Sequence, residues 1–344
     1  MPDGLIVAVG PNGEGKTNLL EAMHFLYALG SPRVSSAEPL VRDGADDAYV
    51  RGEFDTLEGR VLIEIEIRRK GANRVQVDRS PVRRKRDVRR RVRSVLFGPF
   101  DLPIVTGDPS KRRDFMDETT VALQPALDTL TTAYDRVLRQ RNRLLKEHEG
   151  RGAPAGLEAW DEQLVDTGAA VIRARAEAVR AIAPAASGVF AGITGYDLEV
   201  RYLGNVEAAD DIEASFRARL QERRADELQR RTSLVGPHRD DLELAVRDLG
   251  ARGFASHGET WVAALSLRAG TASAVEDALG EPPVLLVDDP YSALDPTRRD
   301  RVASLLAGRR GQVVVSVADE ADIPPQATAI WDIRSGSLAP RKAA

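Results

Sequence analysis

The first hydrophobic segment of the chain is an unbroken apolar run from Leu5 to Val9. The run lacks the alternation of apolar and polar residues that marks a strand with one solvent-facing side, so we expect a strand covered on both faces, as in a parallel sheet. A glycine-rich stretch follows at 10–15, and from Lys16 onward apolar residues recur at helical spacing, at Leu19, Leu20, Met23 and Leu26. The pattern predicts a strand, a loop and a helix in direct succession.

A different pattern occupies residues 61–77. Apolar and charged residues alternate from Ile63 to Ile67, and a turn candidate at 70–73 precedes the strand-like stretch from Arg74 to Val77. Such alternation is typical of an antiparallel hairpin with one face toward solvent. We therefore expect an antiparallel β part after the first helix.

The middle of the chain has the pattern of helices. One apolar stripe covers 123–145, a second runs through 157–182 after a Gly/Pro-rich break, and a third helical segment covers roughly 211–231. We interpret the first stripe as a single helix, and all three segments together as a compact inserted lobe.

Buried-strand patterns return near the end of the chain, at 284–287, 312–317 and 329–333. With the first strand they predict an α/β domain whose sheet is built from both chain ends, with an antiparallel β part and an inserted helical lobe. We place this domain, the head, at 1–105 and 232–344 and the inserted lobe at 106–231.

The composition narrows the range of functions. Of 344 residues, 42% are hydrophobic and 30% are charged, the net charge is −4, and cysteine is absent. The lack of cysteine excludes disulfides and cysteine-ligated zinc, and it fits a reducing cytoplasm. The four histidines include no HExxH pair, which argues against a histidine-built metal site. Without a run of roughly 18–20 uncharged apolar residues or a basic-then-apolar leader, we expect a cytoplasmic protein that does not enter a membrane.

Residues 10–17 read GPNGEGKT and match the phosphate-binding pattern GxxxxGK[ST] at every position. Glycines let successive backbone N–H groups turn toward phosphate oxygens, and the following helix directs the positive end of its dipole at the same anion. We expect the Lys16 ammonium to reach the β- and γ-phosphates of ATP and the Thr17 hydroxyl to bind Mg²⁺. The residues expected to contact the nucleotide are Gly10, Pro11, Asn12, Gly13, Glu14, Gly15, Lys16, Thr17 and Asn18.

Two carboxylates follow the strand pattern at 284–287. Asp288 would lie at the carboxyl edge of the sheet, where α/β proteins bind ligands, and we expect it to hold Mg²⁺ together with Thr17. Asp289 is expected to orient or deprotonate the attacking water. Because aspartate is one methylene shorter than glutamate, we expect slow hydrolysis, with Lys16, Asp288 and Asp289 as the catalytic residues.

Two further motifs resemble those of ABC-type ATPases. Tyr291 to Asp295 resembles the SxLD D-loop, and Ser256-x-Gly258-Glu259 resembles the signature motif, which in that superfamily closes over the ATP bound by a second subunit. A hydroxyl and a bare glycine N–H near a helix start can complete a cage around the γ-phosphate. SxGE alone is equally a helix N-cap pattern, so its weight comes from its order among the other motifs. The resemblance implies nucleotide contacts by Ser256, Gly258, Glu259 and Asp295.

The chain resembles the RecF family over most of its length. The stretches that carry the resemblance are GPNGEGKTNLLEA at 10–22, GDPSKRRDFMD at 107–117, YDRVLRQRNRLLK at 134–146, LVGPHRDDL at 234–242, FASHGETW at 254–261 and PVLLVDDPYSALD at 283–295. The resemblance implies an ABC-type P-loop ATPase head that pairs as an ATP-dependent homodimer, closes on DNA at single-stranded/double-stranded gap junctions and opens after slow, DNA-stimulated hydrolysis. It also implies RecO and RecR as partners in the loading of RecA.

The arginines of the chain are clustered. A basic stripe covers residues 79–93, and three arginines between 136 and 143 lie at i, i+3 and i+7, on one face of the predicted helix. The planar guanidinium suits phosphate oxygens, so both clusters could contact the DNA backbone. The candidates are Arg83, Arg84, Arg86, Arg136, Arg139 and Arg143. A solvated or ion-paired surface explains the two clusters equally well.

Some residues depart from the family pattern and leave alternatives open. The chain begins only a few residues before Leu5, where family members usually carry further strands, and Ala293 stands where a glutamate is usual in the D-loop. These departures favour, as an alternative, a shortened scaffold that binds ATP and DNA without hydrolysis. Another P-loop phosphotransferase and a transporter ATPase subunit are further alternatives, although a phosphotransferase would not explain the SxGE and SxLD motifs.

Overall fold

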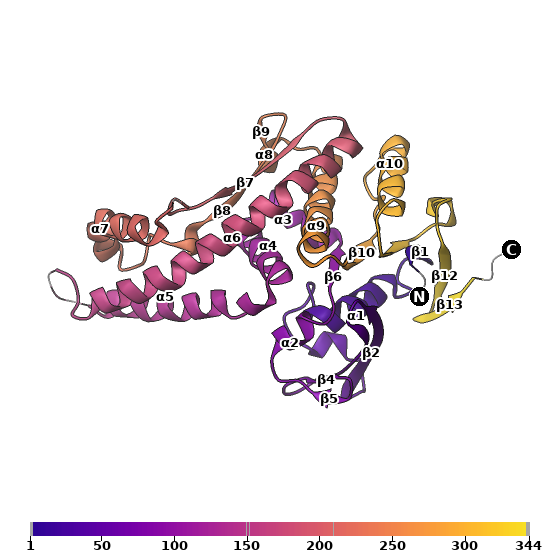
Figure 1. Cartoon of the computed structure of the whole chain (residues 1–344), viewed down its shortest axis with the longest axis horizontal. Helices are drawn as coiled ribbons and strands as arrows, with labels where there is room; N and C mark the ends of the chain where they lie inside the picture. Colours follow the sequence, from indigo (N-terminus) through magenta and orange to yellow (C-terminus); the bar gives the residue numbers. More distant parts are fainter. Residues whose placement is uncertain (1–2, 149, 151, 209, 342–344) are drawn as a thin grey trace.

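A six-stranded, mainly parallel sheet, called here the central sheet, lies in the right half of the molecule in Figure 1. The computed structural model describes residues 3–148, 150, 152–208 and 210–341. The strands, in spatial order, are β13 (Ser337–Pro340), β12 (Ala329–Arg334), β1 (Gly4–Val9), β11 (Gln312–Val317), β10 (Val284–Asp288) and β6 (Ser94–Phe97). Only β13 runs antiparallel to its neighbour. The prediction of an α/β sheet built from both chain ends is confirmed.

Alternate residues of β1 enter two different hydrophobic clusters, which explains why its sequence is apolar throughout. Ile6 packs with Leu20 of α1 (Lys16–Ala28) on one face of the sheet. Leu5 and Val7 belong to the cluster on the other face, which includes residues of α9 (His257–Leu279) and α10 (Pro296–Ala307). A strand covered on both sides loses the alternation of polar and apolar residues.

The antiparallel part is a four-stranded sheet that lies below the central sheet in Figure 1. Its elements are β2 (Asp47–Thr56), β3 (Gly59–Arg68), β4 (Arg74–Val77) and β5 (Ser80–Pro81), with η1 (Glu38–Leu40) before it and α2 (Lys85–Arg89) after it. Ile63 and Ile65 of β3 are buried against Phe25 of α1 and Val88 of α2. The predicted hairpin with one buried face is confirmed.

The helices of the middle segment are η2 (Pro99–Asp101), α3 (Leu102–Thr106), α4 (Pro109–Leu123), η3 (Pro125–Leu127), α5 (Leu130–Glu147), α6 (Leu157–Thr194) and α7 (Ile212–Arg230). Of these, α5, α7 and the first half of α6 extend to the left of the head in Figure 1. The prediction of one helix over 123–145 is wrong, because α4 ends at Leu123 and α5 begins at Leu130. Pro125 accounts for the break, since a proline disfavours helical geometry in the residue before it, here Gln124.

A three-stranded sheet joins the inserted helices to the head, and the hydrophobic pattern did not predict it. It consists of β7 (Leu198–Leu203), β8 (Asp241–Val246) and β9 (Leu249–Gly250). The short helical turns η4 (Pro237–Arg239) and α8 (Ala251–Phe254) flank it, and η5 (Glu320–Asp322) follows β11.

Helix α6 has 38 residues and belongs to two hydrophobic clusters. Its first half packs with α5 and α7 through Leu164 and Ile172, while its second half packs with the head through Ile182 and Phe190. Phe115 of α4 also lies in the head cluster, so that cluster includes residues from both sides of the predicted boundary at 106. The division of the chain at 106 and 231 stays a prediction.

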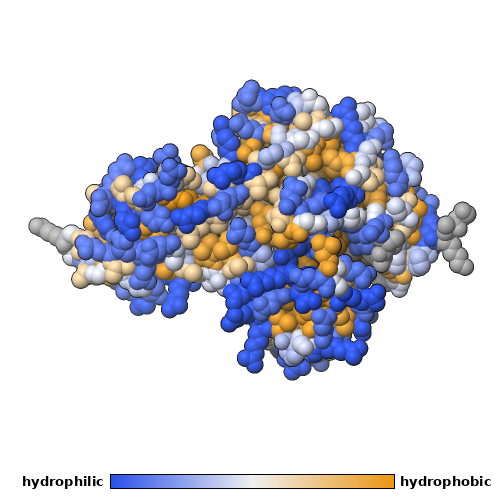
Figure 2. All heavy atoms as spheres, in the orientation of Figure 1, coloured by the Kyte–Doolittle hydropathy of each residue, from blue (hydrophilic) through white to orange (hydrophobic). Residues whose placement is uncertain are grey.

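By length and composition alone, α6 is also the one helix of the described residues that could cross a membrane, and a third of its most apolar window is buried. Its packing in both clusters accounts for that composition without a membrane. Figure 2 shows that the face in view is mainly hydrophilic.

Candidate functional site

The glycine-rich loop connects β1 to α1 and has a backbone that requires glycine at particular positions. Gly13 and Gly15 have φ values of 86° and 102°, in the left-handed region that other residues rarely adopt. A Cβ on Gly10 would lie 2.3 Å from the carbonyl oxygen of Ile333 in β12. Gly15 is the N-cap of α1, so the free N–H groups of the first turn face the loop.

Lys16 lies inside the loop that precedes it. Its buried ammonium donates hydrogen bonds to the carbonyl oxygens of Gly10 (2.6 Å) and Pro11 (2.9 Å). A positive charge is thereby held beside the N-terminus of α1, and this combination attracts anions such as phosphate.

The carboxylate of Asp288 meets the start of α1 at the carboxyl edge of the sheet. The hydroxyl of Thr17 donates to its Oδ2 (2.7 Å), and the hydroxyl of Ser316, at the neighbouring position of β11, donates to its Oδ1. Asp288 is buried, and its two oxygens are held by these bonds. Two oxygen donors from one hydroxyl and one carboxylate suit Mg²⁺, which prefers oxygen and retains several waters.

Asp289 follows Asp288 with a backbone φ of 52°. Its N–H donates to the backbone oxygen and the hydroxyl of Ser316, which fixes the start of this turn. Desolvation and the nearby carboxylates of Asp288 and Asp322 raise the pKa of Asp289 above its usual value. A carboxylate with a raised pKa is a better proton acceptor.

Glu14 and Asn18 anchor the loop to other parts of the head. The Glu14 side chain accepts a hydrogen bond from the N–H of Ser335, and its backbone oxygen accepts one from Gly336, in the turn between β12 and β13. Asn18 accepts a hydrogen bond of 3.1 Å from Arg33, which also pairs with Glu21. Sequence reasoning missed Arg33, because a lone arginine in a loop carries no local pattern.

The predicted signature motif forms the start of α9. Ser256 and Glu259 make a reciprocal capping box, in which the N–H of each residue donates to the side chain of the other. Glu259 also accepts hydrogen bonds from Tyr196 and Arg247. Although burial acts in the opposite direction, the hydrogen bonds from Tyr196 and Ser256 and the charge of Arg247 lower the pKa of Glu259 to about 2.

The D-loop packs beside the signature motif. A Cβ on Gly258 would lie 3.1 Å from the backbone oxygen of Ala293, and Asp295 is the N-cap of α10, where it accepts from the N–H of Arg298. Among the described residues, no hydrogen bond or ion pair connects Ser256 or Gly258 with the phosphate loop of the same chain. The predicted site residues therefore form two groups that are not bonded to each other. One is the phosphate loop with Asp288, and the other is the signature motif with the D-loop.

The candidate DNA contacts lie on two exposed surfaces. Arg136, Arg139 and Arg143 are exposed on α5, and Arg143 pairs with Glu147 on the same helix at 2.8 Å. Arg83 and Arg84 are exposed just before α2, whereas Arg86 is half-buried.

Other arginines are part of the buried structure. Arg175 makes a two-pronged ion pair with Asp117 (2.7 and 2.9 Å) and lies 3.4 Å from Asp240, while Arg112 makes a similar pair with Asp241. These pairs connect the 107–117 and 234–242 stretches. Sequence reasoning did not predict them, since partners 58 to 129 positions apart leave no local signal.

Arg141 is fully buried between α5, α6 and α7. It donates to Asp161 (2.8 Å), Ser233 (2.6 Å) and Glu227 (2.6 Å). The sequence holds one signal for it, because Arg141 continues the buried stripe of Tyr134, Val137 and Leu145.

A glycine-rich loop before the first helix, an aspartate at the end of a nearby parallel strand, and a capped signature helix next to a D-loop define the head of an ABC-type ATPase. The family model described as RecF/RecN/SMC N terminal domain matches residues 1–330. "DNA replication and repair protein RecF" of Frankia alni is 42% identical over 94% of this chain and 90% of its own length, and the protein of that name from Streptomyces avermitilis is 41% identical over 93% and 89%. The chain belongs to the RecF family.

Solved structures agree with this assignment. The structure described as "the recombination mediator protein RecF-ATP in RecFOR pathway" has a TM-score of 0.87 and 27% identity, and the match covers 99% of this chain and 92% of that one. An Smc head domain from Pyrococcus yayanosii, 15% identical with a TM-score of 0.58 over 99% of this chain and 92% of that one, shares the fold.

Proposed function

We propose that this chain is an ATP-dependent DNA-binding protein of recombinational gap repair. The observation that carries the proposal is the hydrogen bond between Thr17 and Asp288, which brings the P-loop helix and the strand-end carboxylate into one site. The similar solved structures are named for RecF with ATP and with ATPrS, which supports ATP as the nucleotide.

The loop residues Gly10 to Asn18 would surround the phosphates. The Lys16 ammonium would then donate hydrogen bonds to phosphate oxygens instead of to the carbonyl oxygens of Gly10 and Pro11. Thr17 and Asp288 would hold Mg²⁺, whose chemistry when bound is to neutralise phosphate charge. Asp289, which follows the proposed metal ligand at the carboxyl edge of the sheet, would accept the proton of the attacking water. Because the aspartate side chain is shorter than that of glutamate, hydrolysis would be slow. DNA would stimulate it.

The separation of the signature from the loop supports pairing of two heads. Ser256 and Gly258 would complete the phosphate site of a second copy, and Glu259 and Asp295 would hold the two helix starts in place, as their capping bonds do here. The homodimer would then depend on ATP. Burial of a γ-phosphate between two copies provides the differential contact that such coupling requires.

DNA would lie against the exposed arginines. Arg136, Arg139 and Arg143 on α5 and Arg83, Arg84 and Arg86 near α2 would contact backbone phosphates at a gap junction. In the cytoplasm the chain would act with RecO and RecR to load RecA, and the RecFOR pathway named for the similar structures supports this part of the proposal. In this proposal residues 1–105 and 232–344 act as the ATPase head, and residues 106–231 act as the inserted lobe, which contacts DNA.

Sedimentation velocity with ATP and Mg²⁺, with and without a gapped duplex, tests the proposal. We expect the wild-type chain to shift from monomer to dimer only when ATP is present, and Lys16→Ala to stay monomeric because it lacks the phosphate-binding charge. A wild-type chain that binds no ATP would contradict the proposal, and one that binds ATP but neither pairs nor hydrolyses it would favour the shortened scaffold.

A further inference from the structure

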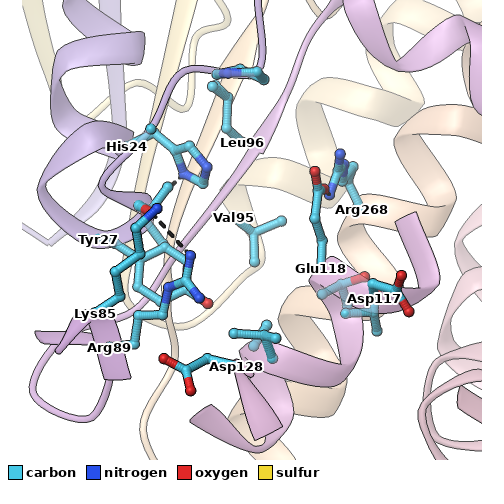
Figure 3. A pocket seen from close by; sticks show the side chains of 18 of the residues that line it. His24, Tyr27, Lys85, Arg89, Val95, Leu96, Asp117, Glu118, Asp128 and Arg268 are labelled. Atoms are coloured by element: carbon cyan, nitrogen blue, oxygen red, sulfur yellow. Dashed lines mark hydrogen bonds and ion pairs between the residues drawn. The ribbon is translucent and has the colours of Figure 1, made fainter. Parts of the chain in front are cut away.

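A cavity of about 400 Å³ lies between the antiparallel part and the inserted helices (Figure 3). Its walls come from the C-terminal end of α1, from α2, β6 and α4, and from the start of α5. The volume is within the range of pockets that hold small organic groups. Tyr27 of the cavity lies roughly 16 Å along α1 from Lys16, so the cavity is separate from the phosphate loop.

The walls combine apolar surface with buried polar atoms that lack partners. Val95, Leu96 and Phe100 supply apolar surface. Among the described residues, the hydroxyl of Thr119 and Oδ1 of Asp128 have no hydrogen-bond partner although both atoms are buried. Buried polar atoms without partners are costly unless a ligand or water pairs with them. Both residues line the cavity, so a rotation of either side chain would bring a hydrogen-bonding atom beside its hydrophobic wall.

Charged side chains of both signs line the cavity. Figure 3 shows Asp117, Glu118 and Arg268 on one side of the cavity and Lys85 and Arg89 on the other, with Asp128 next to Arg89. Asp117 and Glu118 are neutralised by Arg175 (2.7 Å) and Arg268 (2.9 Å), respectively.

In the part of the chain that the structure describes, Lys85, Arg89 and Asp128 make no ion pair, and the Asp128 carboxylate interacts electrostatically with Lys85. A neutral ring with N–H groups would donate to the Asp128 carboxylate and leave Lys85 and Arg89 to the phosphates.

The cavity opens between the two arginine clusters. Lys85 and Arg89 belong to α2, which directly follows Arg83 and Arg84, and Thr131 belongs to α5, which carries Arg136 further along. In Figure 2, hydrophilic residues border the notch between the inserted lobe and the antiparallel part. A DNA strand whose phosphates are held by both clusters would pass the mouth of the cavity.

We propose that this cavity binds an unpaired nucleobase of single-stranded DNA. The inference rests on the proposed DNA binding and specifies single-stranded DNA as the form that this site recognises. Only an unstacked base can leave the strand and enter a cavity at low cost. The Phe100 ring and the apolar residues of β6 contact the base, and Thr119 and Asp128 pair with its polar edge. The phosphates stay outside, on Lys85 and the neighbouring arginines.

Binding of single-stranded oligonucleotides that contain 2-aminopurine, compared with the same oligonucleotides made abasic at that position, tests this site. We expect the wild-type chain to change the 2-aminopurine fluorescence and to bind the intact strand about tenfold more tightly than the abasic one. Thr131→Phe fills the rim of the cavity and is expected to abolish both differences. Thr132→Phe, one position further and exposed, is the matched control and should keep both.

A second variant tests the same site without adding a large side chain that could disturb the packing of the protein. Asp128→Asn preserves the size of the side chain and is expected to reduce the preference for adenine and cytosine, which carry amino groups, over thymine. Equal affinity of the wild-type chain for intact and abasic strands would overturn the nucleobase site and leave the proposed function standing. Thr131→Phe with wild-type fluorescence and affinity would overturn it too, whereas a wild-type chain that binds neither strand would overturn the DNA-binding function itself.

Discussion

The hydroxyl of Thr17 donates a hydrogen bond of 2.7 Å to Oδ2 of Asp288, although 271 positions separate the two residues. One lies in the first turn of α1 and the other ends β10, so the bond ties the phosphate loop to the carboxyl edge of the sheet. The same two oxygens are the proposed ligands of Mg²⁺.

Replacement of Asp288 by asparagine tests that role. We expect Asp288→Asn to slow Mg²⁺-dependent ATP hydrolysis by at least about tenfold, because the amide lacks the charge that holds the metal. Binding of a fluorescent ATP analogue in EDTA should stay close to wild type. Thr17→Ser, which keeps a hydroxyl, is the control and should hydrolyse ATP as the wild type does. Unchanged phosphate release by Asp288→Asn would remove it from the metal site.

Two glycines of the loop should differ in their tolerance of alanine. Gly10→Ala places a Cβ 2.3 Å from the Ile333 carbonyl oxygen, whereas the same change at Gly13 meets open space at a φ of 86°. We expect Gly10→Ala to lower the free energy of unfolding by about 2–3 kcal/mol and Gly13→Ala by about 1 kcal/mol. Urea denaturation followed by circular dichroism measures both, and equal losses would contradict the predicted clash.

Two arginines on α5 provide a comparison between a buried and an exposed ion pair. Arg141→Ala leaves Glu227 fully buried without a counter-charge, although Asp161 keeps its pair with Arg224, and we expect a loss of about 3–5 kcal/mol in the free energy of unfolding. Arg143→Ala breaks only a surface pair with Glu147, so its cost should stay within about 0.5 kcal/mol. Thermal or denaturant unfolding distinguishes them, and similar stabilities would contradict the prediction.

The exposed face of α5 should contribute to the salt dependence of DNA binding. We expect the combined change of Arg136, Arg139 and Arg143 to glutamine to lower the slope of log K against log salt by up to about 3, since each phosphate contact accounts for about one. The control is the triple change of Arg217, Arg219 and Arg223 on α7, which pair with carboxylates. An unchanged slope in the α5 variant would exclude that face.

His238 should make the protein less stable in mild acid. Its Nδ1 accepts a hydrogen bond from Tyr134 (2.7 Å) and its Nε2 donates to the Ser233 carbonyl (3.2 Å), while burial lowers its pKa from 6.5 to about 4. Between these values the unfolded chain binds a proton that the folded chain does not, so stability falls as the pH drops from about 6.5 toward 4.

Between pH 7 and 5 the contribution of His238 is about 2 kcal/mol. His238→Asn should therefore show a flatter pH profile of the free energy of unfolding than the wild type. Parallel profiles would contradict the assigned role, and His24, whose pKa burial lowers to about 3, provides a second site with the same sign.

The sequence predicted the buried parallel strands well because an uninterrupted apolar run such as 5–9 or 284–287 has few other stable uses. The phosphate loop and Asp288 could also be placed, since the first has fixed spacing and the second ends a buried strand. Pro125 explains the missed break between α4 and α5, as a single apolar stripe outweighed a proline that should have ended the helix.

The remaining features depend on partners that are distant in the chain. Arg175 meets Asp117 and Asp240 only after α4, α6 and the 234–242 stretch have come together. β7 and β8 pair although at least 38 positions separate the paired residues, from Leu203 to Asp241, and neither has a pattern strong enough to predict a sheet alone. Likewise, the Ser256–Glu259 pattern predicts a cap, but its hydrogen bonds with Tyr196 and Arg247 require the folded chain.

Helix α6 makes the inserted helices and the head mechanically continuous. The same helix supplies Leu164 to the hydrophobic cluster of the inserted helices and Phe190 to that of the head. The insertion therefore cannot be removed without cutting through α6. A chain that lacked residues 106–231 would therefore also lose Ile182 and Phe190 from the hydrophobic core of the head.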